Sequence, residues 1–88
     1  MAYRHAHHIA RQARFNTCPV LSVHRNYNMA GQVQWEVLMG QDESSGFKET
    51  TAPTRSEAIA RAQDVKRASD GFITEIWAQH GRGMILQP

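Results

Sequence analysis

The strongest constraint on this chain is an alternation of apolar and polar side chains over residues 32–39, QVQWEVLM, which only Leu38 interrupts. Successive side chains of a β-strand point to opposite faces. Positions 33, 35, 37 and 39, which include Trp35, would therefore share one apolar face, and positions 34, 36 and 38 the other. A strand with one apolar face needs a second layer packed against it, so the segment predicts a sheet covered by a helix.

Further strands are predicted on both sides of this segment. Alternation of the same kind extends over residues 20–27 and 47–51, and a fourth apolar segment covers residues 72–79. Residues 28–31 and 80–83 have the composition of turns, and residues 40–46 that of a polar loop. Residues 84–88 are taken as a tail.

A helix is predicted within residues 52–71. Thr54 and Glu57 have the spacing of a capping box, in which each side chain bonds the other residue's free backbone N–H. Pro53 blocks extension of the helix toward the N-terminus, and Gly71 is a natural C-terminal stop. An apolar stripe would lie on the sheet; its members are Ala58, Ile59, Ala62 and Val65.

Residues 2–14 are predicted to form a second helix, because alanines and Ile9 recur at spacings of three and four. The predicted fold class is therefore α+β in the order α-β-β-β-α-β. An N-terminal helix precedes a three-stranded antiparallel meander packed by one helix, and a final strand joins an edge or pairs with another copy. All 88 residues form one domain, with a basic, His-rich helical arm over residues 1–16 and an α+β core over residues 20–80.

Cysteine content and hydropathy bear on the compartment. Cys18 is the one cysteine, so no disulfide can form within the chain, which is typical of a reducing compartment. No apolar run approaches the roughly 18–20 residues that span a bilayer. The N-terminus also lacks the apolar segment of a secretory signal. These features predict a cytoplasmic protein that does not contact a membrane.

A family resemblance covers about residues 20–85. Three features carry this resemblance: Trp35 and Val37 on one strand, Phe47 on the next strand, and a helix that begins with the pattern T-x-x-E-A-I-x-x-A. In these features the chain resembles the small bacterial family called domain of unknown function 2188. The matching positions also include Thr54, Glu57, Ala58, Ile59, Ala62 and Gly81. The resemblance implies a fold and no activity, because fold alone does not determine function.

Charge is unevenly distributed along the chain. Residues 1–28 carry four arginines and no acid, a net +4, whereas residues 29–88 carry six basic residues against eight acids, a net −2. We consider three interpretations of the basic arm: a solvated helix face, a strip that grips nucleic-acid phosphates, or a docking strip for an acidic protein or a second copy. The candidate binding residues are Arg4, His8, Arg11, Arg14 and Arg25.

Metal and catalytic sites are not predicted. His5, His7 and His8 lie close together, but a zinc site needs three or four ligands and the segment offers no acid. Cys18, His24 and Asp42 are not placed together by any motif, and no glycine-rich phosphate loop or paired-carboxylate signature is present. We expect a non-enzymatic protein that uses neither a cofactor nor a small-molecule substrate.

Large apolar groups on both sides of residues 72–79 indicate that both faces of that strand are covered. Ile73 and Trp77 would share one of these faces, which either the N-terminal helix or a second copy could cover. We favour the second copy, with Ile73 and Trp77 as the predicted oligomer interface. The sequence therefore predicts a small interaction module that acts through protein contacts and self-associates. The alternative is a module that binds an RNA or DNA backbone through the basic N-terminal helix.

Overall fold

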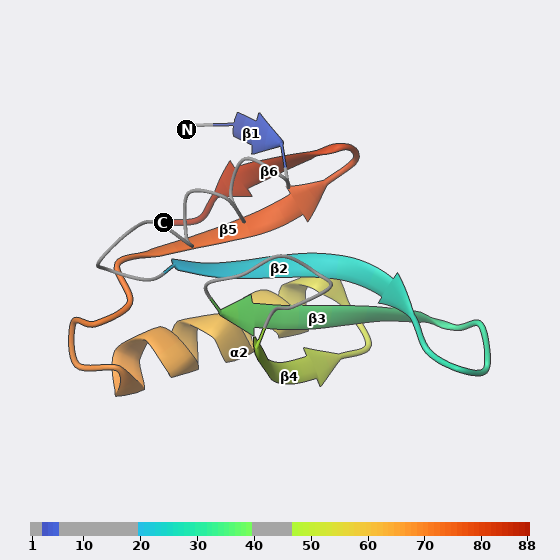
Figure 1. The fold of residues 1–88 in the computed structure, drawn as a ribbon, viewed down its shortest axis with the longest axis horizontal. Helices are drawn as coiled ribbons and strands as arrows, with labels where there is room; N and C mark the ends of the chain where they lie inside the picture. Colours follow the sequence, from blue (N-terminus) through green and yellow to red (C-terminus); the bar gives the residue numbers. More distant parts are fainter. Residues whose placement is uncertain (1–2, 6–19, 40–46) are drawn as a thin grey trace.

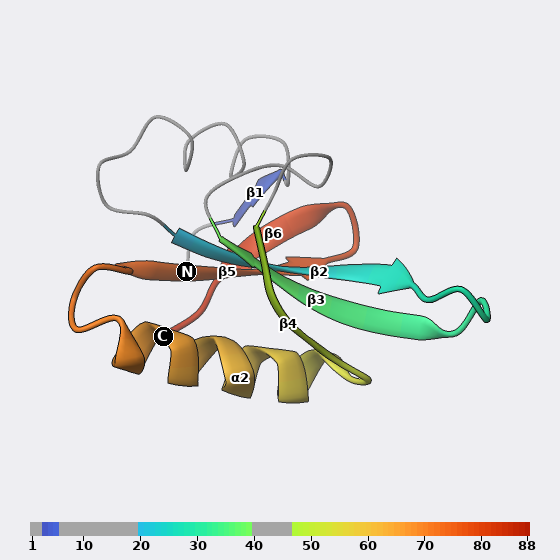
Figure 2. The ribbon, with the colours of Figure 1, turned by 60° about the horizontal axis from the view of Figure 1, so that its bottom comes forward.

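The computed structural model describes residues 3–5, 20–39 and 47–88. Its elements, in chain order, are β1 (Tyr3–His5), β2 (Val20–Tyr27), β3 (Val33–Met39), β4 (Phe47–Ala52), α2 (Arg55–Ala68), β5 (Glu75–His80) and β6 (Gly83–Leu86). The strands form one sheet in the order β1-β6-β5-β2-β3-β4 (Figure 1). Helix α2 lies along one face of that sheet (Figure 2).

The prediction of a three-stranded antiparallel meander with a separate final strand is wrong. The sheet is mixed and six-stranded, because β5 pairs in parallel with β2 and antiparallel with β6. The predicted final strand is thus an interior strand, and neither an edge nor a pairing site for another copy. The residues taken as a tail form β6: a positive φ of 61° at Gly81 closes a tight turn that pairs His80 with Gly83.

The predicted N-terminal helix over residues 2–14 is also contradicted at its start. Tyr3–His5 forms strand β1, which pairs antiparallel with β6 and places Arg4 opposite Met84. The alanine-rich segment has good helix propensity, but pairing with the outer side of β6 overrides propensity here. Residues 6–14 of the predicted helix lie outside the described residues.

Helix α2 covers the face of the sheet that the alternation over residues 32–39 predicts. Val37 is fully buried there with Ala58 and Ala62 of the helix, and Trp35 packs against the same cluster while half-buried. Val33 on the same face is 46% exposed. The pairing of β3 with β4 ends at Trp35, so Val33 has no β4 residue beside it. The predicted burial of the strand face is therefore confirmed at its centre and lost toward the β2–β3 turn.

A second apolar cluster lies on the opposite face of the sheet, which we call the second face. Trp77, Val20 and Met84 are buried there, and Leu86 packs against them. The indole N–H of Trp77 donates to the Glu75 carboxylate at 3.2 Å. Ile76 and Ala78 of the same strand are buried on the helix side, so both faces of β5 are covered, as predicted.

The N-cap of α2 provides a first test. The Thr54 hydroxyl accepts a hydrogen bond from the backbone N–H of Glu57 at 3.2 Å. Thr54→Ala is expected to lower the free energy of unfolding by about 1 kcal/mol, because a helix N–H loses its partner. Urea unfolding measures the loss, with exposed Ser56→Ala as the control. Equal unfolding midpoints for Thr54→Ala and the native chain would show that the cap contributes no stability.

Candidate functional site

The turn between β2 and β3 is held by one side chain. The Asn28 carboxamide oxygen accepts hydrogen bonds from the backbone N–H groups of Ala30 and Gln32, at 2.9 and 3.0 Å. Two backbone bonds close the same turn: Asn28 N–H donates to Gln32, and Gly31 N–H donates to Asn28, both at 2.9 Å. Gly31 has a φ of 79°, which favours glycine. The hairpin end therefore has a defined conformation.

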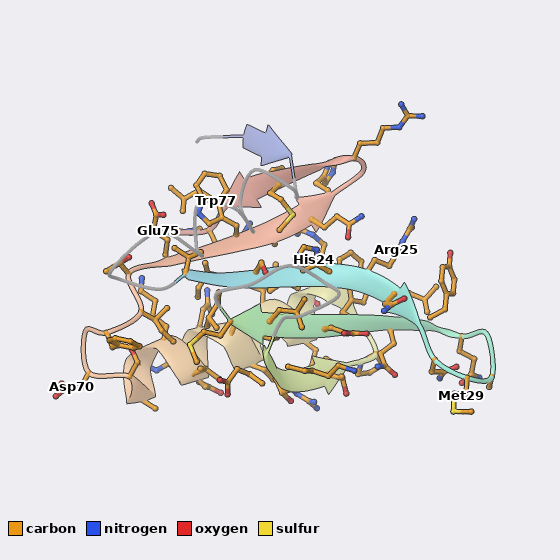
Figure 3. All side chains as sticks on the ribbon, viewed as in Figure 1. His24, Arg25, Met29, Asp70, Glu75 and Trp77 are labelled. Atoms are coloured by element: carbon orange, nitrogen blue, oxygen red, sulfur yellow. The ribbon has the colours of Figure 1, made fainter. Side chains whose placement is uncertain are left out.

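Three apolar side chains are exposed at this hairpin end. Tyr27 is 59% exposed, Val33 46% and Met29, at the turn, fully exposed. Tyr27 and Val33 are paired in the β2–β3 register, so their side chains lie next to each other on one face. The hairpin projects beyond the rest of the sheet, with Met29 at its tip (Figure 3). We call Tyr27, Met29 and Val33 the hairpin patch.

A hollow lies beside the hairpin patch. It has a volume of about 340 Å³, and its lining includes Val33, Gln34, Ala52, Pro53 and Arg61. The described pairing of β4 with β3 ends at Ala52 opposite Trp35, so β3 extends past its neighbour by two residues at this point. Val33 of the hairpin patch thus lines a recess whose wall also includes the Arg61 side chain.

Three arginines are brought to the same end of the sheet by Gln79. The Gln79 side chain accepts from the backbone N–H of Arg25 at 2.9 Å and donates to the carbonyl of Gly81 at 3.1 Å. Arg55 Nε donates to the backbone carbonyl of Gln79 at 2.9 Å. Gln79 therefore ties together β2, the N-terminus of α2 and the turn that carries Arg82. Arg25 and Arg82 are exposed, and Arg55 is half-buried.

Polar side chains are also buried on the second face. Ser22, His24 and Glu36 are 4%, 5% and 9% exposed, and the β2–β3 register places His24 opposite Glu36. The Glu36 carboxylate accepts from Asn26 Nδ2 at 2.7 Å and lies 3.5 Å from Lys48 Nζ. The negative charge of the Glu36 carboxylate is therefore compensated by the Lys48 ammonium group and the Asn26 amide. At this burial the Ser22 hydroxyl and the His24 imidazole do not face solvent.

The structure separates the predicted site residues. Arg25 is exposed beside the hairpin patch, whereas Arg4 lies in β1. His8, Arg11 and Arg14 lie outside the described residues, as do Cys18 and Asp42. Two of the clustered histidines, His7 and His8, are outside them too, and no group of three potential metal ligands occurs among the residues described.

The predicted interface residues are buried within the chain. Ile73 is 3% exposed in the helix-side cluster, and Trp77 is 1% exposed in the cluster on the second face. The prediction that both lie on one face of a strand is wrong, because Ile73 precedes β5, which begins at Glu75. Neither side chain offers surface to a second copy in this arrangement.

Sequence reasoning missed the hairpin patch and Arg82. Tyr27 and Val33 follow the strand alternation, which predicts that they are buried. Only the folded structure shows that β4 and α2 do not extend far enough along the sheet to cover these two side chains. Met29 was the one signal in the sequence, because it is a large apolar residue within a predicted turn.

The fold and the exposed hairpin define a class: a small domain with a mixed sheet, one covering helix in its described part and a projecting, apolar-tipped hairpin. Comparisons with protein-family models, characterised proteins and solved structures found no match to this chain. The resemblance to the domain of unknown function 2188 family therefore stays a prediction. None of the helices in the described part of the chain has the length and apolar character to cross a membrane.

Proposed function

We propose that this chain is a non-enzymatic interaction module that binds a short segment of another protein at the hairpin patch. The observation that carries the proposal is the exposure of Tyr27, Met29 and Val33 on a turn whose conformation is fixed by Asn28. Single exposed apolar side chains are ordinary on protein surfaces, whereas a contiguous group of them is typical of a contact site.

The size and composition of the patch support a peptide segment as the partner. A standard interface between folded proteins buries about 800 Å² on each side, which three side chains do not supply. Tyr, Met and Arg are the residue types enriched at the centres of interfaces, and Tyr27, Met29 and Arg25 lie together here. A preformed turn also reduces the entropy lost when a partner binds.

The non-enzymatic part of the proposal rests on accessibility. A catalytic nucleophile or base must lie within hydrogen-bonding distance of its substrate. The buried Ser22 and His24 side chains are not placed to meet a substrate from solvent. The hairpin patch is accessible but carries neither a carboxylate nor an imidazole, and the exposed His80 at the end of β5 has no Asp, Glu, Ser or Cys next to it in sequence, within residues 79–83.

Selection from a random peptide library displayed on phage tests the proposal directly. The full chain is expected to enrich peptides that the triple variant Tyr27→Thr, Met29→Ser, Val33→Thr no longer retains, because that variant removes the apolar contact and keeps strand-compatible residues. Phe72→Ser is the matched control, because Phe72 is 58% exposed but lies just after α2, away from the hairpin. Thermal unfolding confirms that each variant is folded.

Two results would overturn the proposal. One is that no peptide is enriched over the unselected library. The other is that the hairpin variant, verified as folded, retains the same peptides as the native chain. Loss of the peptides in Phe72→Ser alone would place the contact site at the opposite end of the molecule.

A further inference from the structure

We infer that the segment bound at the hairpin patch is acidic, with its carboxylates meeting Arg25 and Arg82. This inference rests on the proposed function and specifies the chemistry of the partner. It combines the apolar hairpin patch with the arginines that Gln79 brings to the same end of the sheet.

Arg25 and Arg82 are held at the same end of the sheet by hydrogen bonds of Gln79. Because Gln79 bonds both the backbone of Arg25 and the carbonyl of Gly81, the strand that carries Arg25 is fixed to the turn that carries Arg82. Arg25 is also two residues before Tyr27 on β2, so it lies on the same face as the exposed ring. Arg25 therefore lies beside the apolar contact, and the two hydrogen bonds of the Gln79 side chain hold the turn that carries Arg82 at the same end of the sheet.

The segments at this end of the sheet carry a net positive charge. Residues 25–33, 53–55 and 79–83 contain Arg25, Arg55 and Arg82 and no Asp or Glu, a net +3. Two acids on neighbouring elements are compensated, Glu36 by Lys48 and Glu57 by Arg61. At the other end of the molecule, residues 64–75 carry three acids against two basic residues, and Arg25 and Asp70 lie at opposite ends in Figure 3.

The same charge argues against two other occupants. A second copy seated symmetrically on this patch would bring two sets of arginines together, and like charges at an interface are unfavourable. Single-stranded nucleic acid needs several stacking platforms along a basic groove, and Tyr27 is the one aromatic residue of the patch. Met29 and Val33 add apolar contacts, which suit side chains of a peptide better than phosphates.

The phage selection described above also tests this inference through the composition of the selected peptides. The native chain is expected to enrich Asp and Glu at least twofold over the unselected library, next to apolar residues. The double variant Arg25→Gln, Arg82→Gln should lose the acidic enrichment, whereas Lys66→Gln, Arg67→Gln, with the same loss of charge at the far end, should keep it. Arg25→Lys, Arg82→Lys should also keep it, because the charge is retained.

The peptide most enriched by the native chain then gives a quantitative readout by fluorescence anisotropy. Removing two exposed ion pairs is expected to weaken its binding about tenfold, and added salt should weaken binding to the native chain more than to the glutamine variant. Oligo(dT) and a mixed-sequence RNA serve as probes for the alternative ligand. Sedimentation of the native chain alone serves as the probe for a second copy.

The outcomes separate the inference from the proposed function. Peptides that depend on the hairpin patch but show no acidic enrichment would overturn the inference and leave the proposed function standing. Absence of any hairpin-dependent peptide would overturn the proposed function itself. Binding of oligo(dT) or RNA that the glutamine variant loses, or a native dimer that the hairpin variant abolishes, would assign the patch to another occupant and overturn the inference.

Discussion

Trp77→Ala is expected to lower the free energy of unfolding by about 3–5 kcal/mol, the usual cost of truncating a large buried aromatic side chain. The side chain is 1% exposed and packs with Val20 and Met84, so its removal leaves a cavity on the second face. A chain of 88 residues is stable by only about 4–13 kcal/mol, at 0.05–0.15 kcal/mol per residue. The substitution therefore removes a large part of the stability, and urea unfolding measures it.

If Trp77→Ala does not fold, a more conservative variant can still measure how much the Trp77 side chain stabilises the fold. Trp77→Phe retains an aromatic ring and is expected to unfold at a denaturant concentration between those of the native chain and the alanine variant. Sedimentation should give the same mass for the native chain and Trp77→Phe, because the indole is buried inside one chain. A stability loss below about 1 kcal/mol for Trp77→Ala, together with a change in oligomeric state, would instead place Trp77 at an interface.

Local signals in the sequence predicted the individual elements of residues 20–68. The alternation predicted β2 over Val20–Tyr27 with both bounds as observed, and β3 and β4 each within one residue. Thr54 and Pro53 marked the start of α2, because capping and the missing N–H of proline act within one turn of a helix. These features depend on residues near in sequence, so the sequence shows them directly.

The order of the sheet depends on contacts between distant residues and could not be predicted. Ile76 pairs with Leu21, 55 positions away, and nothing in either segment specifies a parallel neighbour. Short segments are also ambiguous: Met84–Leu86 has the composition of a tail until it pairs with β5, and Tyr3–His5 suits a helix until it pairs with β6. Tertiary pairing decides the conformation of such segments.

The candidate site was only partly predictable for the same reason. Arg25 could be named as a candidate binding residue because an excess of positive charge over residues 1–28 is visible in the sequence. The contact of Gln79 with Arg25 spans 54 positions, so the convergence of Arg25 and Arg82 appears only in the folded chain. Exposure of Tyr27 and Val33 depends on how far β4 and α2 extend, and composition does not contain that information.

Leu21→Ala is the counterpart of the Trp77 substitution on the helix side of the sheet. Leu21 is fully buried in β2 and pairs with Met39 on one side and Ile76 on the other. Truncation is expected to lower the free energy of unfolding by about 2–5 kcal/mol through lost burial and the cavity it leaves. Leu21→Met nearly conserves the volume and should cost less than about 1.5 kcal/mol.

The position of β2 makes the Leu21 variant a test of cooperativity as well. In the described sheet, β2 is the strand between the β3–β4 half and the β5–β6 half, and helix α2 contacts both halves as well. A cavity at Leu21 therefore weakens both halves together, and the transition should stay two-state. Circular dichroism, which follows the whole fold, and tryptophan fluorescence, which follows Trp35 in one half and Trp77 in the other, should give one midpoint. Two separate midpoints would mean that the halves unfold independently and that β2 does not couple them.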